Sequence, residues 1–309
     1  MMRFLADWLR PSKAKIVKTA KTAEKVELVE MPQLVSRAGV VDSRICGLVD
    51  NVQSGWFRQD SGELLEGFAI TSADVVLDVG CGEGGATMFA ARCGAHVIFS
   101  DTDAAQVERL SAKVAESPAR GAQPLVCDTN PLPLPDGCAS RIIAMEMLEH
   151  VDDPAQVLAE LVRVGQPGAL YLLTVPDPVG EGLQKKLAPA SHFQKPNHIH
   201  VFEREAFAAL VSAAGLQIER RHASGFFWSL WMCLYWASKP DSDGSGNGDM
   251  GATRDNIKPP YPPLLDEWAK TWHQLISLPE GARIKQVLDS VMPKSQAIIA
   301  RKPHHPDHR

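Results

Sequence analysis

The stretch VVLDVGCGEGGAT, from Val75 to Thr87, determines the fold class that the sequence predicts. A run of β-branched residues ends in a glycine-rich turn, and the following ATMFAARCG has the pattern of a helix that closes with a glycine. A strand, a glycine turn and a helix in this order direct backbone N–H groups and the positive helix end toward a ligand. Gly80, Gly82 and Gly85 match G-x-G-x-x-G, which alone does not distinguish a dinucleotide from another nucleotide ligand.

The alternation of strands and helices continues beyond this stretch. Apolar strand patterns occur at AHVIFSD, QPLVCD, SRIIAM and ALYLLTV, with helical patterns between them. A helix at REAFAALVSAAG and a strand at LQIERRH follow, and SQAIIARKP adds a last strand near the C-terminus. Strands that are apolar throughout and alternate with helices predict an α/β fold with a parallel sheet covered on both faces.

Changes in composition along the chain predict three regions. Residues 1–70 are expected to form an N-terminal helical extension or lid, and residues 71–223 with 294–302 the ligand-binding α/β domain. Residues 224–293 form an insertion that holds five of the seven tryptophans, with a flexible Ser/Gly/Asp linker at 239–257. The insertion is expected either to cap a substrate site or to lie in a membrane interface, where tryptophan and tyrosine are favoured.

The overall composition restricts the partners and the compartment. The net charge of −5 gives no reason to expect nucleic acid as a partner, and six scattered cysteines without a C-x-x-C pair favour a reducing, cytoplasmic location. No secretory signal pattern is found at the N-terminus. Residues 1–25 carry seven Lys or Arg against two acids, which suits either a docked helix or contact with the inner face of a membrane. The uncharged segment 225–238 is too short to span a bilayer but long enough to lie in one.

Three aspartates at the ends of successive predicted strands identify the ligand class. Asp78 precedes the glycine turn and would repel a pyrophosphate, whereas it would attract an ammonium or a sulfonium. Asp101 ends the second strand, where a carboxylate can accept hydrogen bonds from both ribose hydroxyls. Asp128 ends the third strand, where it can accept from an adenine amino group. A cationic adenosine ligand, S-adenosylmethionine, satisfies all three.

The segments LDVGCGEGG, FSDTD, VCDTNPLPLPDG and AMEMLEHVDDP resemble the successive motifs of class I S-adenosylmethionine-dependent methyltransferases, of the type 11 kind. The resemblance covers Ala73 to Ala223 and SQAIIARKP, and it implies a Rossmann-like seven-stranded sheet whose last strand is antiparallel. It implies that the glycine turn holds the methionine part of the cofactor, the second strand end the ribose and the third the adenine. The implied cofactor-binding residues are Asp78, Gly80, Cys81, Gly82, Asp101, Thr102, Cys127, Asp128, Thr129 and Met145.

The stretch MEMLEHV is similar to that of ubiquinone O-methyltransferases, and E-x-x-E-H also occurs in small-RNA 2′-O-methyltransferases. This resemblance implies a divalent cation such as Mg²⁺ held by Glu146, Glu149, His150 and His198, which would orient an acceptor hydroxyl and lower its pKa. Catalysis without a metal is the alternative, with Glu146 in the site and His198 or His200 as general base. A third interpretation gives the turn residues a packing role only.

These patterns predict a methyltransferase that acts on a hydroxyl of a bulky, partly apolar small-molecule or lipid-like acceptor, such as a quinone-like, lipid-linked or glycosyl compound. Two alternatives remain at this level. G-x-G-x-x-G by itself favours an NAD-dependent oxidoreductase. A degenerate site would make the chain a non-catalytic cofactor-binding scaffold, although the three strand-end aspartates are intact.

Overall fold

The computed structural model describes residues 43–238 and 260–304. The basic segment 1–25 and the linker 239–257 lie outside the described residues, so the predictions made for them are not addressed by the structure.

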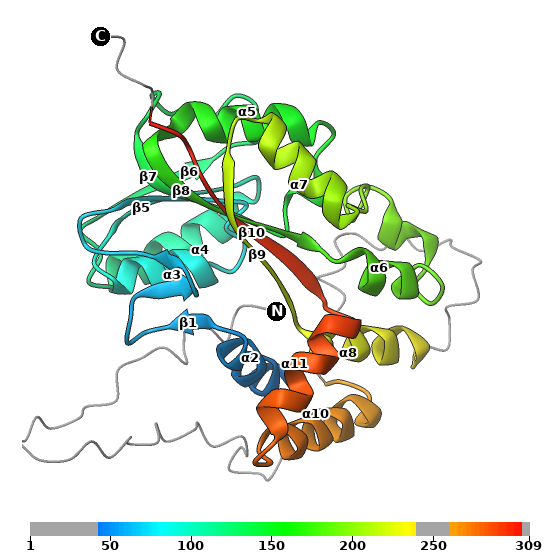
Figure 1. Cartoon of the computed structure of the whole chain (residues 1–309). Coiled ribbons are helices and arrows are strands. Elements are labelled where there is room, and N and C mark those ends of the chain that lie inside the picture. Colours follow the sequence, from blue (N-terminus) through cyan, green and yellow to red (C-terminus); the bar gives the residue numbers. More distant parts are fainter. Residues whose placement is uncertain (1–42, 239–259, 305–309) are drawn as a thin grey trace, which may run out of the picture.

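A seven-stranded sheet forms the centre of the molecule, with the strand order β6-β5-β4-β7-β8-β10-β9 (Figure 1). Neighbouring strands are parallel from β6 to β8, whereas β10 is antiparallel to both β8 and β9. The predicted α/β sheet with an antiparallel last strand is therefore confirmed. The strands are β4 Val75–Val79, β5 His96–Asp101, β6 Gly121–Val126, β7 Ala139–Met145, β8 Gly165–Pro176, β9 Gln217–Ser224 and β10 Ser295–Arg301.

Helices cover both faces of the sheet because successive strand residues alternate between two apolar cores. Val76 and Phe99 pack with α3 (Gly85–Arg92) and α4 (Ala104–Ala115) on one face. Leu77 and Ile98 pack with α5 (Pro154–Val164) and α7 (Arg204–Ala213) on the other. Since β4, β5 and β8 are buried on both sides, their continuous apolar runs are explained by the fold.

The chain leaves β4 toward β5 and β6 on one side and later returns to β7 on the other. This reversal puts a crevice at the carboxyl ends of β4 and β7, where open α/β sheets bind their ligands. The segments above this edge are α6 (Pro178–Gln184) and the 3₁₀ helices η1 (Leu148–His150) and η2 (Ala190–Phe193).

The described part of the N-terminal region contains one helix, α2 (Ser43–Gln53), followed by a small antiparallel sheet. Gly62 and Gly67 have φ angles of 69° and 95°, which allow the two tight turns of this sheet. The segment predicted as a lid is therefore a β-meander. Its strands are β1 Trp56–Arg58, β2 Glu63–Leu65 and β3 Phe68–Ala69.

The insertion contributes α8 (Phe226–Ala237), α10 (Pro263–Ile276) and α11 (Gly281–Val291), which pack with α2 at one end of the sheet (Figure 1). The aromatic side chains of this layer face inward and form their own core; the buried ones are Phe227, Trp228, Trp231, Tyr235, Trp236 and Trp272. This burial favours the cap interpretation of 225–238, because an interfacial helix would expose its aromatic face. Among the described helices, none combines the length and apolarity that crossing a bilayer requires.

A buried ionic network ties the insertion to α2. The Lys285 ammonium lies 2.9 Å from Asp50 Oδ1 and 2.6 Å from Asp289 Oδ2, and Trp272 Nε1 donates to Asp50. Asp289 also accepts hydrogen bonds from the first two N–H groups of α8, at Gly225 and Phe226. Because no other side chain caps the N-terminus of α8, Asp289 fixes the position at which this first helix of the insertion begins.

Candidate active site

A cavity of about 840 Å³ lies at the carboxyl ends of β4, β5, β6 and β7. All ten residues that the sequence predicted to bind the cofactor line this cavity: Asp78, Gly80, Cys81, Gly82, Asp101, Thr102, Cys127, Asp128, Thr129 and Met145. The cavity continues toward α2, α8 and the start of β10, so that one space joins the predicted cofactor and acceptor ends.

The glycine turn needs its glycines for two separate reasons. Gly80, Gly82 and Gly84 have φ angles of 67°, 48° and 82°, in the left-handed region that other residues rarely adopt. A Cβ at Gly84 would come within 2.2 Å of the Leu110 side chain, so this position also allows α4 to pack closely. The sequence pattern pointed to Gly85, but that residue is the first of α3, and the conformationally required position is its neighbour Gly84.

Asp101 is held in place by the turn that it faces. Its Oδ2 accepts from the Gly82 N–H at 2.9 Å, and its Oδ1 accepts from the Asp103 N–H at 3.0 Å. A carboxylate oxygen has two lone pairs, so each oxygen keeps one acceptor position toward the cavity. This arrangement suits two neighbouring hydroxyls of a ribose.

Asp78 is only 4% exposed and accepts a hydrogen bond from the Thr87 hydroxyl. Burial, with a smaller contribution from Asp101, raises the pKa of Asp78 to about 6. A phosphate placed here would meet two carboxylates, whereas a ligand with positive charge would relieve the cost of the buried anion. The residues present therefore fit S-adenosylmethionine.

The third strand end completes this half of the cavity. Asp128 is exposed and accepts from the Asn130 N–H at 3.3 Å, so its second oxygen remains available to an amino group. Burial raises the pKa of the neighbouring Cys127 thiol, so this side chain of the cavity wall is neutral near pH 7.

Two acids follow β7 in different surroundings. Glu146 has a φ of 51°, a left-handed conformation that is rare outside glycine and typical of functional sites. Its Oε1 accepts from the Thr174 hydroxyl at 3.1 Å, and its Oε2 lies 3.4 Å from the Lys294 ammonium. Glu149 is fully buried, and neither of its carboxylate oxygens accepts a hydrogen bond from another described residue. Burial first, and Glu146 second, raise the pKa of Glu149 well above its usual range.

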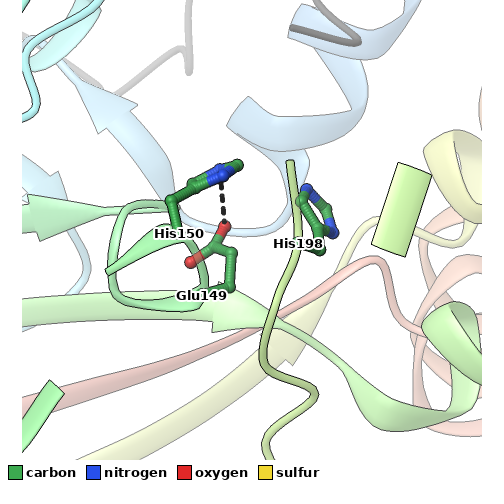
Figure 2. A group of neighbouring side chains, drawn as sticks. All are labelled: Glu149, His150 and His198. Atoms are coloured by element: carbon green, nitrogen blue, oxygen red, sulfur yellow. Dashed lines mark ion pairs between the residues drawn. The ribbon is translucent and has the colours of Figure 1, made fainter. Parts of the chain in front are cut away.

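His150 at the end of η1 and His198 after η2 are held in fixed orientations. His150 Nδ1 lies 2.9 Å from the carbonyl oxygen of Asn197, so it carries the proton and leaves Nε2 as an acceptor in the neutral ring. Burial lowers the pKa of His150. The rings of His150 and His198 meet edge to face at 5.1 Å, with Glu149 beneath them (Figure 2).

His198 has the hydrogen-bonding arrangement in the cavity that best suits a general base. Its Nδ1 lies 2.8 Å from Oε2 of Glu181, a carboxylate of α6 that is 1% exposed. Although burial raises the pKa of Glu181, the hydrogen bond with His198 and the nearby Lys294 lower it below its usual value. An ionised carboxylate on Nδ1 fixes the tautomer in which Nε2 accepts a proton.

The other predicted base, His200, is not part of the site. Among the described residues that line the cavity, His198 and His150 are present and His200 is not. His200 Nε2 lies 2.9 Å from the carbonyl oxygen of Val151 and ties two loops together. The two histidines are two residues apart, a spacing that places both side chains on the same side of an extended chain, so the sequence could not separate them. Their different hydrogen-bond partners, Glu181 for His198 and Val151 for His200, distinguish the two rings.

Two groups of the site were not predicted from the sequence, Glu181 and Lys294. Glu181 lies in PVGEGLQ, directly after the β8 strand, and Lys294 directly precedes β10. Burial lowers the pKa of Lys294, but Glu146, Glu181 and Glu149 outweigh it and raise that pKa above its ordinary value. Glu181 could have been predicted as a site residue because it follows a strand end. No pattern in the neighbouring sequence identifies Lys294 as a site residue.

The predicted metal site is only partly assembled. Ligand atoms of Glu149, His150 and His198 lie within 4.8 Å of one another. The fourth predicted ligand, Glu146, is instead engaged by Thr174 and by the ammonium of Lys294. The ammonium of Lys294 interacts electrostatically with Glu149 as well as with Glu146, and it disfavours a divalent cation here because like charges repel.

Known proteins resemble this chain over its central part. The family described as "Methyltransferase domain" matches residues 77–173. The ubiquinone biosynthesis O-methyltransferase of Hahella chejuensis is 39% identical over 104 residues, covering 32% of this chain and 42% of that protein. The methyltransferase GfsG of Streptomyces halstedii is 32% identical over 197 residues, covering 55% and 66%. The tocopherol O-methyltransferase of Arabidopsis thaliana is 36% identical over 100 residues, covering 32% and 29%.

This chain spans only 34% to 52% of the length of three further relatives that it matches. Among solved structures, a protein described as a methyltransferase from Bacillus halodurans superposes with a TM-score of 0.50 at 16% identity, covering 76% of this chain and 95% of that one. The similarity to this solved structure shows that the two proteins share a fold. The motif set, the sheet with its antiparallel last strand and the matching family agree, and the chain belongs to the class I S-adenosylmethionine-dependent methyltransferase superfamily.

Proposed function

We propose that this protein transfers the methyl group of S-adenosylmethionine to a hydroxyl oxygen of a bulky, partly apolar acceptor. The observation that carries the proposal is the single cavity with carboxylates at one end and the His198–Glu181 pair at the other. S-adenosylmethionine supplies an electrophilic methyl group, whose bonding electrons return to the sulfur when the acceptor oxygen attacks.

The protein contributes binding, orientation and removal of one proton. Asp78 and Asp101 hold the cationic and the ribose parts of the cofactor. His198 Nε2 takes the proton of the acceptor hydroxyl, and Glu181 keeps the ring in the required tautomer and stabilises it once protonated. Binding of both partners in one cavity aligns the acceptor oxygen with the methyl group.

The acceptor end of the cavity has one apolar and one polar wall. The apolar wall comes from α2, β1 and α8, and its residues are Leu48, Trp56, Phe57, Trp228 and Met232. His150, His198 and Lys294 form the polar wall opposite. A quinone-like, lipid-linked or glycosyl acceptor with one reactive hydroxyl suits this division, and the relatives named for tocopherol and ubiquinone support a phenolic ring.

The experiment compares small molecules from cells that express the wild-type protein with those from cells that express the Asp101→Ala variant. The proposal expects a metabolite heavier by one methylene in the wild-type sample alone, labelled when methyl-deuterated methionine is fed. A labelled carbon- or nitrogen-methyl product would reject the hydroxyl acceptor. Equal label in both samples would reject the methyltransferase activity.

We further propose, from the sequence alone, that residues 1–25 bring the protein to the cytoplasmic face of a membrane where a lipid-linked acceptor resides. Vesicles with anionic phospholipid should pellet the wild-type protein. They should pellet less of a variant in which Lys13, Lys15, Lys18 and Lys21 are replaced by Gln. Equal pelleting would remove this part of the proposal.

A further inference from the structure

Lys294 occupies a fixed position between the last two strands. Its backbone N–H donates to the carbonyl oxygen of Ser224 at 2.9 Å, at the point where β9 ends and β10 begins. Its side chain is 17% exposed and lines the cavity. The ammonium is therefore presented to the acceptor end from the junction of two hydrogen-bonded strands.

Three carboxylates from three separate elements surround this ammonium. Glu146 follows β7, and its Oε2 lies 3.4 Å from Nζ of Lys294. Glu149 belongs to η1 and Glu181 to α6, and both interact electrostatically with Lys294. Glu149 and Glu181 are essentially inaccessible to solvent, so their charges need a nearby cation or a proton.

Two of these acids belong to groups that could otherwise hold a metal ion: Glu149 with His150 and His198, and Glu181 with His192 and His198. A divalent cation among these residues would share a buried space of low dielectric constant with the ammonium of Lys294. Repulsion between like charges is strong there and is little reduced by salt. Lysine and metal are therefore alternative occupants of the acid cluster.

We propose that the ammonium of Lys294 is the resident cation of this cluster, in place of a divalent metal, and that it holds the acceptor oxygen as the proton passes to His198. The first half stands on the arrangement of charges. The second half rests on the proposed O-methylation, in which the oxygen gains negative character and an ammonium can donate a hydrogen bond to it. Lys294 thus binds and orients the oxygen, whereas His198 removes its proton.

The test uses the full-length protein stripped of metals with a chelator, and Mn²⁺ as the probe, followed by electron paramagnetic resonance and calorimetry. Wild-type protein is expected to bind no Mn²⁺ at this site up to millimolar concentration. Lys294→Met is expected to bind one equivalent, on the order of a hundredfold more tightly. Adding Glu149→Gln to Lys294→Met should abolish the gain, and Lys294→Arg, which keeps the charge, should show none.

Lys195→Met is the matched control, because Lys195 also lines the cavity but is exposed and paired with Asp152. This variant should behave like the wild-type protein. A stoichiometric Mn²⁺ site in the wild-type protein that Glu149→Gln removes would overturn the proposal, and so would a folded Lys294→Met variant that gains no Mn²⁺. Melting curves and S-adenosylhomocysteine binding of each variant report folding. Absence of S-adenosylhomocysteine binding in the wild-type protein would reject the proposed function but leave the assignment of Lys294 standing.

Discussion

Replacing Asp78 by Asn is expected to stabilise the cofactor-free protein while weakening its affinity for the cofactor. The carboxyl group of Asp78 lies at the end of β4, almost fully buried, and accepts a hydrogen bond from the Thr87 hydroxyl. An asparagine oxygen can accept the same bond, so the substitution removes the charge and keeps the shape. Stability and binding should then change in opposite directions.

The size of the stability effect follows from the pKa of Asp78. Burial raises it from 3.8 to about 6, roughly two pKa units, which corresponds to about 3 kcal/mol. Because the folded pKa is the higher one, the favourable contribution of Asp78 is complete below pH 3.8 and is lost as the pH rises through 6. The variant should therefore exceed the wild-type free energy of unfolding by about 3 kcal/mol near pH 8 and by about half of that near pH 5.

The binding effect should have the opposite sign. A charge-assisted hydrogen bond between Asp78 and the cofactor ammonium contributes about 1.5–3 kcal/mol, so the variant should lose roughly 10- to 100-fold in affinity for S-adenosylhomocysteine near pH 8. Urea unfolding at several pH values measures the first effect, and calorimetry the second. A stability difference that does not change with pH, or an unchanged affinity, would refute the reasoning.

Asp74→Asn is the matched control for the sign of the change in stability. Burial acts to raise the pKa of Asp74, but hydrogen bonds from Thr71 and Ser140 and the charge of Arg141 outweigh it and lower the pKa. The contribution of Asp74 is therefore present above its unfolded pKa and lost as the pH falls through the folded value. This variant should be less stable than the wild-type protein near neutral pH and should bind the cofactor normally.

Three further predictions concern ribose binding, the His198–Glu181 pair and the buried ionic network of the insertion. Asp101→Ala should weaken S-adenosylhomocysteine binding about 100-fold by calorimetry, since two ribose hydrogen bonds are lost. The control Asp103→Ala should only cost about 1 kcal/mol of stability, because it removes the side-chain cap of α4. Equal affinities of the Asp101→Ala variant and the wild-type protein would exclude the ribose assignment. Glu181→Gln should lower kcat by about 100-fold or more in a single-substrate methylation assay with little change in cofactor affinity, because the His198 ring loses its anionic partner; an unchanged kcat would mean that the pair is structural. Lys285→Met should lower the free energy of unfolding by about 3–5 kcal/mol in urea, because two buried carboxylates lose their cation; a loss within the error of the measurement would show that the network is dispensable.

The part of the fold that depends on local pattern could be predicted from the sequence. The strand ending at Val79, the glycine turn and the helix beginning at Gly85 follow from neighbouring residues. The cofactor residues could be found as a group because the carboxyl ends of parallel strands share one edge, whatever their distance in sequence. For this reason all ten predicted residues line a single cavity.

Features that depend on tertiary packing were out of reach. Glu146 and Lys294 are 148 residues apart and meet only because β10 returns beside β8 after the insertion. The orientation of His200 depends on the Val151 carbonyl, which no periodicity reveals. Likewise, the aromatic run of α8 has the same composition whether it lines a protein core or a membrane interface, and only its contacts with α2 and α10 distinguish the two.

Calorimetry of the full-length protein with S-adenosylmethionine and, separately, with NAD⁺ tests the central claim most directly. The claim is that the carboxylates of Asp78 and Asp101 select a positively charged nucleoside over a diphosphate. S-adenosylmethionine should bind with one equivalent per chain, and NAD⁺ should give no binding heat and no competition. Binding of NAD⁺ in place of S-adenosylmethionine would contradict the account.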